Sequence, residues 1–254
     1  MSSLLRNRLA PKHTKWFNYR HQVASQLKPF LRPGDIFVRK GNHVFNYFVH
    51  FSRFVEWLTK SKYSHASLVY RVEADDVVLA EVSDYGVRRI YLLDWLDELQ
   101  GSDFLVLRYN GSPYGSYEII EAATHFIRLD LPYNTDLDLE KQNSLYCVQF
   151  IYKCFECAGI SLAPGKSLEE MPNWKSWLKL IARLLSYPIN KPIYFVGNEE
   201  VGLLSSKSLS KVMHVKLSEV KQGKALLPCS LDPFAWNGKS EQIRQLVPIY
   251  THVR

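Results

Sequence analysis

The sequence lacks long apolar runs and has little cysteine. Charged residues interrupt every hydrophobic stretch before it reaches the roughly 20 residues that a membrane-spanning helix needs. The first thirty residues have neither the continuous apolar segment nor the small-residue cleavage site of a secretory signal, so we expect no signal peptide. The four cysteines stand at positions 147, 154, 157 and 229, without the spacing of a disulfide framework. These absences predict a cytoplasmic protein in a reducing compartment.

Signals for cofactors and metals are equally scarce. The 12 glycines are scattered, and none forms the glycine-rich loop that binds a phosphate group. Cys154 and Cys157 make a C-x-x-C pattern, but both fall within a predicted helix and no second ligand pair lies close in sequence. The histidines other than His65 lack the spacing of metal ligands. We therefore expect no metal ion and no cofactor.

The net charge of +7 is concentrated at the N-terminus. Residues 1–40 hold nine lysines and arginines against one acid, Asp35, whereas the rest of the chain is nearly neutral. A basic segment of this kind is most often a solvated surface. It also suits peripheral contact with an anionic membrane, and this alternative stays open. We do not expect a nucleic-acid partner, and no pattern in the sequence indicates an oligomeric state.

The composition and the periodicity predict a folded α+β protein. Hydrophobic residues make up 46% and aromatic residues 13% of the chain, which is enough for a sizeable core. The predicted strands are 36–38, 63–70, 77–82, 86–90 and 104–107, and the predicted helices are 44–60, 92–99, 117–128 and one that carries Cys147. We divide the chain into a basic, partly helical lead-in (1–30), a core (31–165) and a C-terminal extension (166–254).

The C-terminal extension gives mixed signals. Residues 173–186 place tryptophans and leucines on one face of a predicted amphipathic helix, with lysine and arginine largely opposite. Packing of this helix over the core is the plainer interpretation, and an interfacial helix on an anionic membrane is the alternative. Residues 193–196 are typical of a strand, and the Ser- and Lys-rich stretch 205–224 is typical of a mobile loop.

The segment around Cys147 is the strongest candidate for chemistry. Asn143 or Ser144 suits the N-cap of a helix, Gly159 suits its end, and apolar residues recur between them at helical spacing. A thiol in the first turn faces unsatisfied N–H groups and the positive end of the helix dipole, and both favour the nucleophilic thiolate. The alternative is a small buried apolar residue, which describes most free cysteines.

His65 and Glu81 are the candidate partners of this cysteine. A thiol hydrolase needs an imidazole that takes and returns the proton, and a polar group that holds the ring. His65 begins one predicted strand and Glu81 lies near the end of the next, so a hairpin that turns at residues 73–76 would make them near neighbours. A core or surface histidine and a solvated strand carboxylate are the alternatives. An unpaired carboxylate inside the apolar run around Glu81 would be costly if buried.

Several short motifs occur in an order that resembles a known family. They are RPGD at 32–35, YSHA at 63–66, AEVSDYGV at 80–87, LVLRY at 105–109, PYN at 132–134 and YC at 146–147. Their order over residues 30–160 resembles the circularly permuted NlpC-like branch of the papain-fold cysteine hydrolases, and within it the YiiX/YebB-like group. This resemblance implies an α+β, permuted papain-like fold in which an antiparallel β-sheet or barrel packs against the helix that carries the cysteine.

The resemblance also implies roles for four residues. Cys147 would be the nucleophile, His65 the general base and then acid, and Glu81 the group that orients His65. Tyr133 would help to polarise the substrate carbonyl, together with the backbone N–H of Cys147.

The chain departs from the family pattern directly after the cysteine. A small hydroxyl residue and a glutamate are common there, whereas this chain has Val148 and Gln149. The departure bears on substrate preference and leaves the nucleophile, base and orienting group in place. We expect a thiol hydrolase that cleaves an amide or ester bond through an acyl-enzyme, with a peptide, peptidoglycan-fragment or lipid acyl substrate. An acyltransferase with the same Cys–His site and a non-catalytic lipid- or anion-binding protein are the alternatives.

Overall fold

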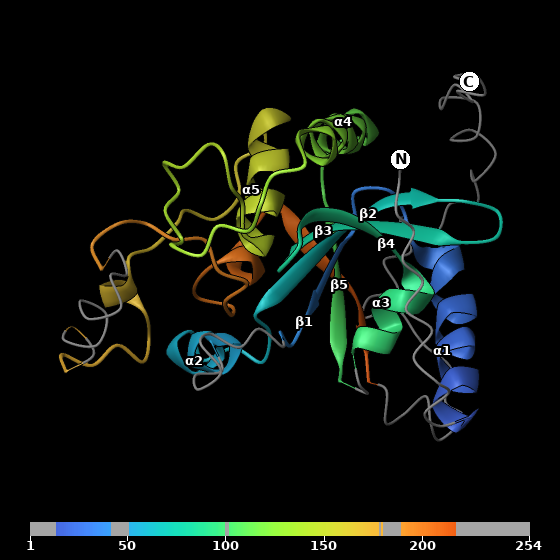
Figure 1. Cartoon of the computed structure of the whole chain (residues 1–254), viewed down its shortest axis with the longest axis horizontal. Helices are drawn as coiled ribbons and strands as arrows, with labels where there is room; N and C mark the ends of the chain where they lie inside the picture. Colours follow the sequence, from blue (N-terminus) through green and yellow to red (C-terminus); the bar gives the residue numbers. More distant parts are fainter. Residues whose placement is uncertain (1–13, 42–50, 100–101, 178, 180–188, 217–254) are drawn as a thin grey trace.

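A six-stranded antiparallel sheet is the centre of the fold (Figure 1). The computed structural model describes residues 14–41, 51–99, 102–177, 179 and 189–216. In sequence order the strands are β1 (Ile36–Arg39), β2 (His65–Val72), β3 (Val77–Ser83), β4 (Gly86–Tyr91), β5 (Phe104–Tyr109) and β6 (Leu209–Val215). Their order in the sheet is β4-β3-β2-β1-β5-β6, which leaves an open sheet and not a closed barrel. The helices are α1 (Thr14–Leu27), α2 (Phe51–Leu58), α3 (Leu92–Glu98), α4 (Pro113–Leu129) and α5 (Cys147–Cys157). This combination has the predicted α+β class.

The β2–β3 hairpin forms where the sequence predicts it. The backbone N–H of Glu73 donates to the carbonyl oxygen of Asp76 at 2.8 Å and closes the turn. Leu68 pairs with Ala80, and the register shifts between Val69 and Arg71. As a result the start of β2 lies beside the end of β3.

The β3–β4 hairpin is tighter and requires a glycine. Ser83 pairs with Gly86, so two residues make the turn. Gly86 has a φ of +87°, and a Cβ atom there would lie 2.5 Å from the carbonyl oxygen of Leu131. This turn fixes the register that places Glu81 opposite Arg88.

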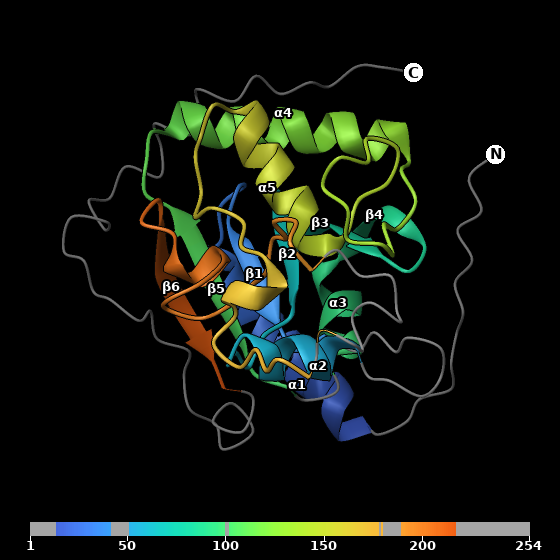
Figure 2. The same ribbon diagram turned by 90° about the vertical axis from the view of Figure 1, so that its left-hand side faces the viewer.

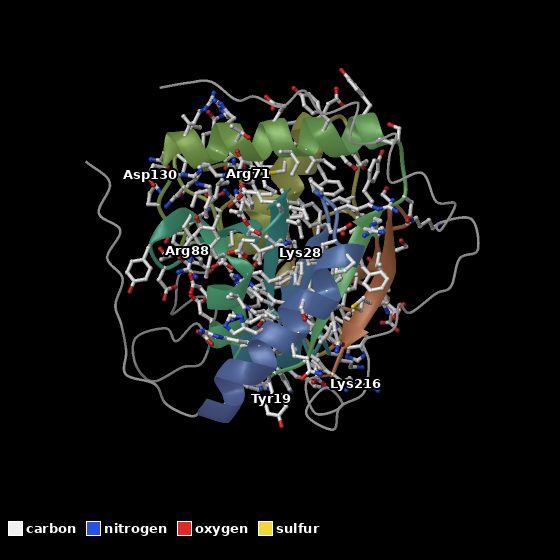
Figure 3. The ribbon with its side chains drawn as sticks, turned by 90° about the vertical axis from the view of Figure 1, so that its right-hand side faces the viewer. Tyr19, Lys28, Arg71, Arg88, Asp130 and Lys216 are labelled. Atoms are coloured by element: carbon white, nitrogen blue, oxygen red, sulfur yellow. The ribbon has the colours of Figure 1, made fainter. Side chains whose placement is uncertain are left out.

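Helices cover both faces of the sheet and create two apolar cores (Figures 1 and 2). Helices α4 and α5 lie over the face that carries Val38, Ala66 and Leu68. Helices α1 and α3 lie over the opposite face, where the aromatic ring of Phe37 packs against Trp95 at a centroid distance of 5.0 Å. Figure 3 looks onto this second face, with α1 lying across the strands.

The described part of the predicted lead-in, residues 14–30, forms α1 and one short 3-10 turn and belongs to the second core. Val23 and Leu27 of α1 are fully buried in it, and Phe30 packs against it. The side chains of Trp16 and Phe17 lie outside the described residues. The predicted helix 44–60 is described only from residue 51, as α2.

Helix α5 begins later than the sequence predicts. Its N-cap is Tyr146 and neither Asn143 nor Ser144, so that prediction is wrong. The backbone N–H of Leu145 donates to the carbonyl oxygen of Pro132 at 3.0 Å, which keeps the chain extended up to the cysteine. The predicted end is confirmed: the helix stops at Ala158, and Gly159 follows with a φ of +69°.

The C-terminal predictions need three corrections. Residues 209–215, expected to be part of a mobile loop, form β6, which pairs with β5 and buries Met213 and Val215. Residues 193–196 form no strand; Ile193 makes a single bridge with Lys166 instead. Residues 173–177, the first part of the predicted amphipathic helix 173–186, form turns and irregular chain, and residue 179 is helical. Residue 178 and residues 180–186 lie outside the described residues. Within the described ranges, no helix has the length and apolar character needed to cross a membrane.

Candidate active site

Cys147 is the first residue of α5 and is almost completely buried, with 7% of its surface exposed. Its Sγ atom lies 3.9 Å from the carbonyl oxygen of Ser64, the residue that precedes His65. The N-terminus of α5 thus meets the start of β2, although the two segments are 83 positions apart. The backbone N–H groups of the first turn of a helix have no hydrogen-bond partner within the helix, and Cys147 lies in that turn of α5.

His65 and Glu81 form a direct hydrogen bond. The distance between His65 Nε2 and Glu81 Oε2 is 2.8 Å, and Glu81 is fully buried. Because Nε2 is engaged by Glu81, Nδ1 is the ring nitrogen left to face the thiol of Cys147. The structure therefore brings together the three residues that the sequence singles out as nucleophile, base and orienting group.

Glu81 is itself held on both oxygens. Oε2 also accepts a hydrogen bond from the hydroxyl of Ser67 at 2.7 Å, and that hydroxyl accepts one from Trp95 Nε1 at 2.9 Å. Oε1 accepts from Arg88 Nε at 2.9 Å and from Arg88 Nη2 at 2.5 Å. A buried carboxylate with four donors has little freedom to turn away from His65.

The surroundings of His65 favour its charged form. Burial lowers the pKa of His65, and so does the nearby charge of Arg39. Cys147 raises it through its charge and a hydrogen bond, and the charge of Glu81 raises it further, so the net effect brings the pKa of His65 to about 9. At neutral pH this imidazole is protonated, and its positive charge stabilises a thiolate beside it.

Glu81 stays ionised despite its burial. Burial raises the pKa of the Glu81 carboxyl, but the charge and hydrogen bond of His65 and the charges of Arg88 and Arg39 outweigh it. The pKa of Glu81 is therefore held well below its usual range. A permanent negative charge stands behind the His65 ring across the ordinary pH range.

Tyr133 lies in the same cavity as Cys147 and His65. Its backbone forms a bridge with Leu145, two residues before the cysteine, so the loop that carries Tyr133 is tied to the start of α5. The cavity has a volume of about 320 Å³. Among the described residues, all four predicted site residues thus gather at one place: Cys147, His65 and Tyr133 in the wall of the cavity and Glu81 behind His65.

Several residues that support the site are not among the candidates that the sequence offers. Arg88, Arg39 and Glu98 are also part of the cavity wall, and Ser67 and Trp95 hold Glu81 from beneath. Arg39 was detectable in principle, because it occupies an inward position of β1, and the other inward position of that strand on the same face is the apolar Phe37. Such positions rarely carry a charge unless it is paired.

The residues after the cysteine have clear structural roles. Val148 lines the cavity, where the family pattern has a small hydroxyl residue. Gln149 is fully buried, and its Oε1 accepts hydrogen bonds from the backbone N–H of Tyr146 at 3.3 Å and from Asn134 Nδ2 at 3.2 Å. Gln149 therefore fixes the first turn of α5 to the loop that carries Tyr133.

The C-x-x-C pattern does not form a ligand site. Cys154 is buried, Cys157 is exposed, and both are free thiols, as is Cys147. Burial raises the pKa of the Cys154 thiol well above its ordinary value, so it resists forming the thiolate that metals bind. In the described part of the chain, no group of three or more His, Cys, Asp or Glu residues could hold a metal ion.

Comparison with known proteins agrees with this geometry. The crystal structure described as the metalloprotein YiiX from Escherichia coli O157:H7 is similar, with a TM-score of 0.56 at 17% sequence identity, over 71% of this chain and 96% of that one. At that identity the likeness concerns the fold. Curated protein sequences give no match. A family model described as "permuted papain-like amidase enzyme, YaeF/YiiX, C92 family" matches residues 31–209. The chain therefore belongs to the family of permuted papain-like amidases.

Proposed function

We propose that this protein cleaves an amide or ester bond through a thioester at Cys147. Membership of an amidase family supports a cysteine hydrolase in general. The observation that carries the specific proposal is one constellation: Cys147 opens a helix against the start of β2, and His65 binds Glu81 through Nε2 at 2.8 Å.

The first half of the reaction forms the acyl-enzyme. The thiolate of Cys147 attacks the substrate carbonyl carbon, and the negative charge moves to the carbonyl oxygen. The backbone N–H of Cys147 and the hydroxyl of Tyr133 are our candidates for stabilising that oxyanion. The tetrahedral intermediate collapses when the imidazolium of His65 gives its proton to the leaving nitrogen or oxygen, which departs as amine or alcohol.

The second half returns the enzyme to its starting state. Neutral His65 takes a proton from a water molecule, whose oxygen attacks the thioester carbon. Collapse of the second intermediate releases the carboxylic acid and restores the thiolate beside protonated His65. Throughout both halves, Glu81 keeps the ring oriented and stabilises its positive charge.

The cavity supports a substrate whose acyl part is at least partly apolar. Beside the reacting groups, its wall includes Val55, Val82, Leu137, Val148, Ile193 and Phe195. Lipid acyl and peptide substrates both meet this condition. The YiiX structure is titled a metalloprotein, but the described residues of this chain include no cluster of metal ligands, so the proposed mechanism contains no metal-dependent step.

Alkylation of the thiols tests the proposal without a known substrate. Iodoacetamide at neutral pH, followed by peptide mass spectrometry, should label Cys147 faster than Cys157, although Cys157 is exposed and Cys147 is buried. His65→Ala should slow the labelling of Cys147 at least tenfold and leave that of Cys157 unchanged. If Cys147 is inert in the folded protein, the hydrolase proposal fails and a binding protein is the better description.

The acyltransferase alternative uses the same first half-reaction. It differs only in the acceptor, since an amine or alcohol replaces water in the attack on the thioester. Product analysis with 4-nitrophenyl acetate, with and without added hydroxylamine or glycerol, distinguishes the two. Transfer that exceeds hydrolysis at millimolar acceptor would favour the transferase.

Peripheral contact with an anionic membrane has some support among the described residues. Trp57 of α2 and Trp177 have 43% and 61% of their surfaces exposed. Their segments are joined, since Asn173 Nδ2 donates to the carbonyl oxygen of Trp57 at 2.6 Å. Sedimentation with phosphatidylserine vesicles tests this contact in Trp177→Ser, with Tyr114→Ser on the exposed surface of α4 as the control. Equal sedimentation of the two variants and the unchanged protein would exclude a role for Trp177.

A further inference from the structure

A row of charged residues crosses the face of the sheet that α1 and α3 cover. Arg39 (β1), His65 (β2), Glu81 (β3) and Arg88 (β4) occupy inward positions on four adjacent strands, and we call these four the charged row. Arg39 lies opposite His65, and Glu81 lies opposite Arg88. The remaining inward positions of these strands are mainly apolar. A row of charges in this setting must be balanced by contacts among its own members or from the helix above.

Glu98, the last residue of α3, provides that contact. Its Oε1 accepts a hydrogen bond from Arg88 Nη2 at 2.7 Å, and its Oε2 accepts from Arg88 Nη2 at 3.0 Å and from Arg39 Nη2 at 3.1 Å. Glu98 thus binds both arginines of the charged row: Arg88, which also binds Glu81, and Arg39, which lies opposite His65. In Figure 3, Arg88 lies near α3 at the β4 side of the sheet.

Among the described residues, Glu98 is the carboxylate that holds Arg39 in position. Its side chain is 6% exposed and its guanidinium lies 5.5 Å from the centre of the Trp95 ring. The Nε atom is buried without a hydrogen-bond partner among the described residues. Without Glu98, the guanidinium of Arg39 would be drawn toward the next available carboxylate, which is Glu81.

The charge balance around His65 shows why this matters. Two arginines and two glutamates cancel while Glu98 is ionised, which leaves the His65–Cys147 pair neutral as a unit. If Glu98 loses its charge, two guanidinium groups share Glu81, and one of them competes with His65 for its oxygen. Both changes disfavour a protonated His65.

We propose that Glu98 is a positioning residue of the active site: by binding Arg88 and Arg39 together, it keeps Glu81 for His65 and holds Arg39 away from that contact. The proposal deepens the proposed function and rests on it for its catalytic meaning. Glu98 does not touch the reacting atoms, and it acts through Arg88, Arg39 and Glu81.

The groups that face His65 come from five elements. They are Cys147 on α5, Glu81 on β3, Arg39 on β1, and, one contact further, Arg88 on β4 and Glu98 on α3. Arg88 and Glu98 are not direct neighbours of the ring, but Arg88 binds Glu81 directly, whereas Glu98 acts only through the two arginines. Glu98→Gln is therefore the informative change, since it keeps the shape and a carbonyl acceptor but removes the charge.

The experiment is an NMR titration of His65 in the full chain, assigned by the loss of its signal in His65→Ala. Glu98→Gln should lower the pKa of His65 by about half to one unit, as expected for one charge removed several ångströms away in a medium of effective dielectric about 20 or more. Asp94→Asn is the matched control, because Asp94 lies exposed on the same helix. It should leave the titration unchanged.

A second measurement separates positioning from substrate contact. Iodoacetamide labelling of Cys147 requires no bound substrate. Glu98→Gln should move the step in its pH profile that accompanies loss of the His65 proton down by about half to one unit, matching the titration. Glu98→Asp keeps the charge and should restore most of the original profile. Circular dichroism spectra and melting temperatures of the variants establish that they fold.

The outcomes are distinct. A titration in Glu98→Gln that equals that in Asp94→Asn overturns the proposal, and so does an unchanged pH profile of Cys147 alkylation. An increase in KM for 4-nitrophenyl acetate with unchanged kcat and unchanged alkylation would make Glu98 a substrate contact instead. Failure of the hydrolase proposal is recognised separately, since Cys147 would then be inert in the unchanged protein.

Discussion

His65 lies between groups that act on its charge in opposite directions. Burial and Arg39 lower its pKa, whereas Cys147 and Glu81 raise it, with a net value of about 9 against 6.5 for an unperturbed histidine. The same residue therefore links the proposed catalysis to stability. A group whose pKa is higher in the folded state stabilises that state as long as it is protonated there.

This linkage predicts how stability depends on pH. The contribution of His65, roughly 3 kcal/mol for such a shift, is fully present below pH 6.5 and is lost as the pH rises through about 9. Urea unfolding of the unchanged protein and of His65→Gln should therefore differ most at pH 6 and converge toward pH 10. Glu81→Gln should shrink the difference, because it lowers the pKa of His65 in the folded state. A constant difference between pH 6 and 10 would contradict the assigned pKa.

The sequence singles out the proposed reacting residues more readily than the residues that contact them. Cys147, His65 and Glu81 are identified because a helix start, a hairpin and short motifs bring three chemically suitable residues together. The same reasoning does not identify the contact between Arg88 and Glu98. Their contact depends on strand register and on where α3 ends above the sheet, and a single sequence specifies neither without the tertiary fold.

At the scale of elements, the first turn of α5 determines where Cys147, the proposed nucleophile, lies. Gln149 binds the backbone of Tyr146 and the side chain of Asn134 through one oxygen, while its own Nε2 is buried without a hydrogen-bond partner among the described residues. The oxygen is therefore the functional part of this side chain. A glutamate, common at this position in the family, offers the same oxygen and adds a negative charge at the helix N-terminus.

This contact predicts that two substitutions of Gln149 differ in their effect on the free energy of unfolding. Gln149→Leu should lower the unfolding free energy by about 1–3 kcal/mol, because two buried donors lose their acceptor, and should also slow alkylation of Cys147. Gln149→Glu should keep stability within about 1 kcal/mol of the unchanged protein. Urea unfolding and iodoacetamide labelling measure both effects. Equal losses in the two variants would show that packing, and not the acceptor oxygen, is what Gln149 provides.

Elements at the edge of the sheet are harder to predict than those at its centre. The central strands are apolar on both faces and were found with small errors at their ends. Strand β6 was missed because Ser210 and Lys211 are exposed on it, so its composition is that of a loop. Its inward residues Met213 and Val215 are too few to reveal the period of a strand without β5 beside them.

For the whole molecule, the open question is whether the lead-in and the extension are separate from the core. The division at residues 30 and 165 stays a prediction. The second core combines α1 from the predicted lead-in, α3 from the predicted core and β6 from the predicted extension. It lies on the same face of the sheet as the charged row. The family match also runs past residue 165, to residue 209. We therefore expect the described parts of all three regions to fold and unfold as one cooperative unit.

Two substitutions far from the site test this expectation. Leu27→Ala in α1 and Met213→Ala in β6 each remove a fully or almost fully buried side chain, and each should lower the unfolding free energy by about 2–5 kcal/mol. Leu129→Ala at the end of α4, where 48% of the side chain is exposed, serves as the control and should change it by less than about 1 kcal/mol. Unfolding is followed by tryptophan fluorescence and by the alkylation of Cys147. In one cooperative unit the two curves coincide in every variant and shift together in Leu27→Ala and Met213→Ala. If the lead-in and the extension were independent attachments, the curve from Cys147 would stay in place, because the site would outlast the loss of either one.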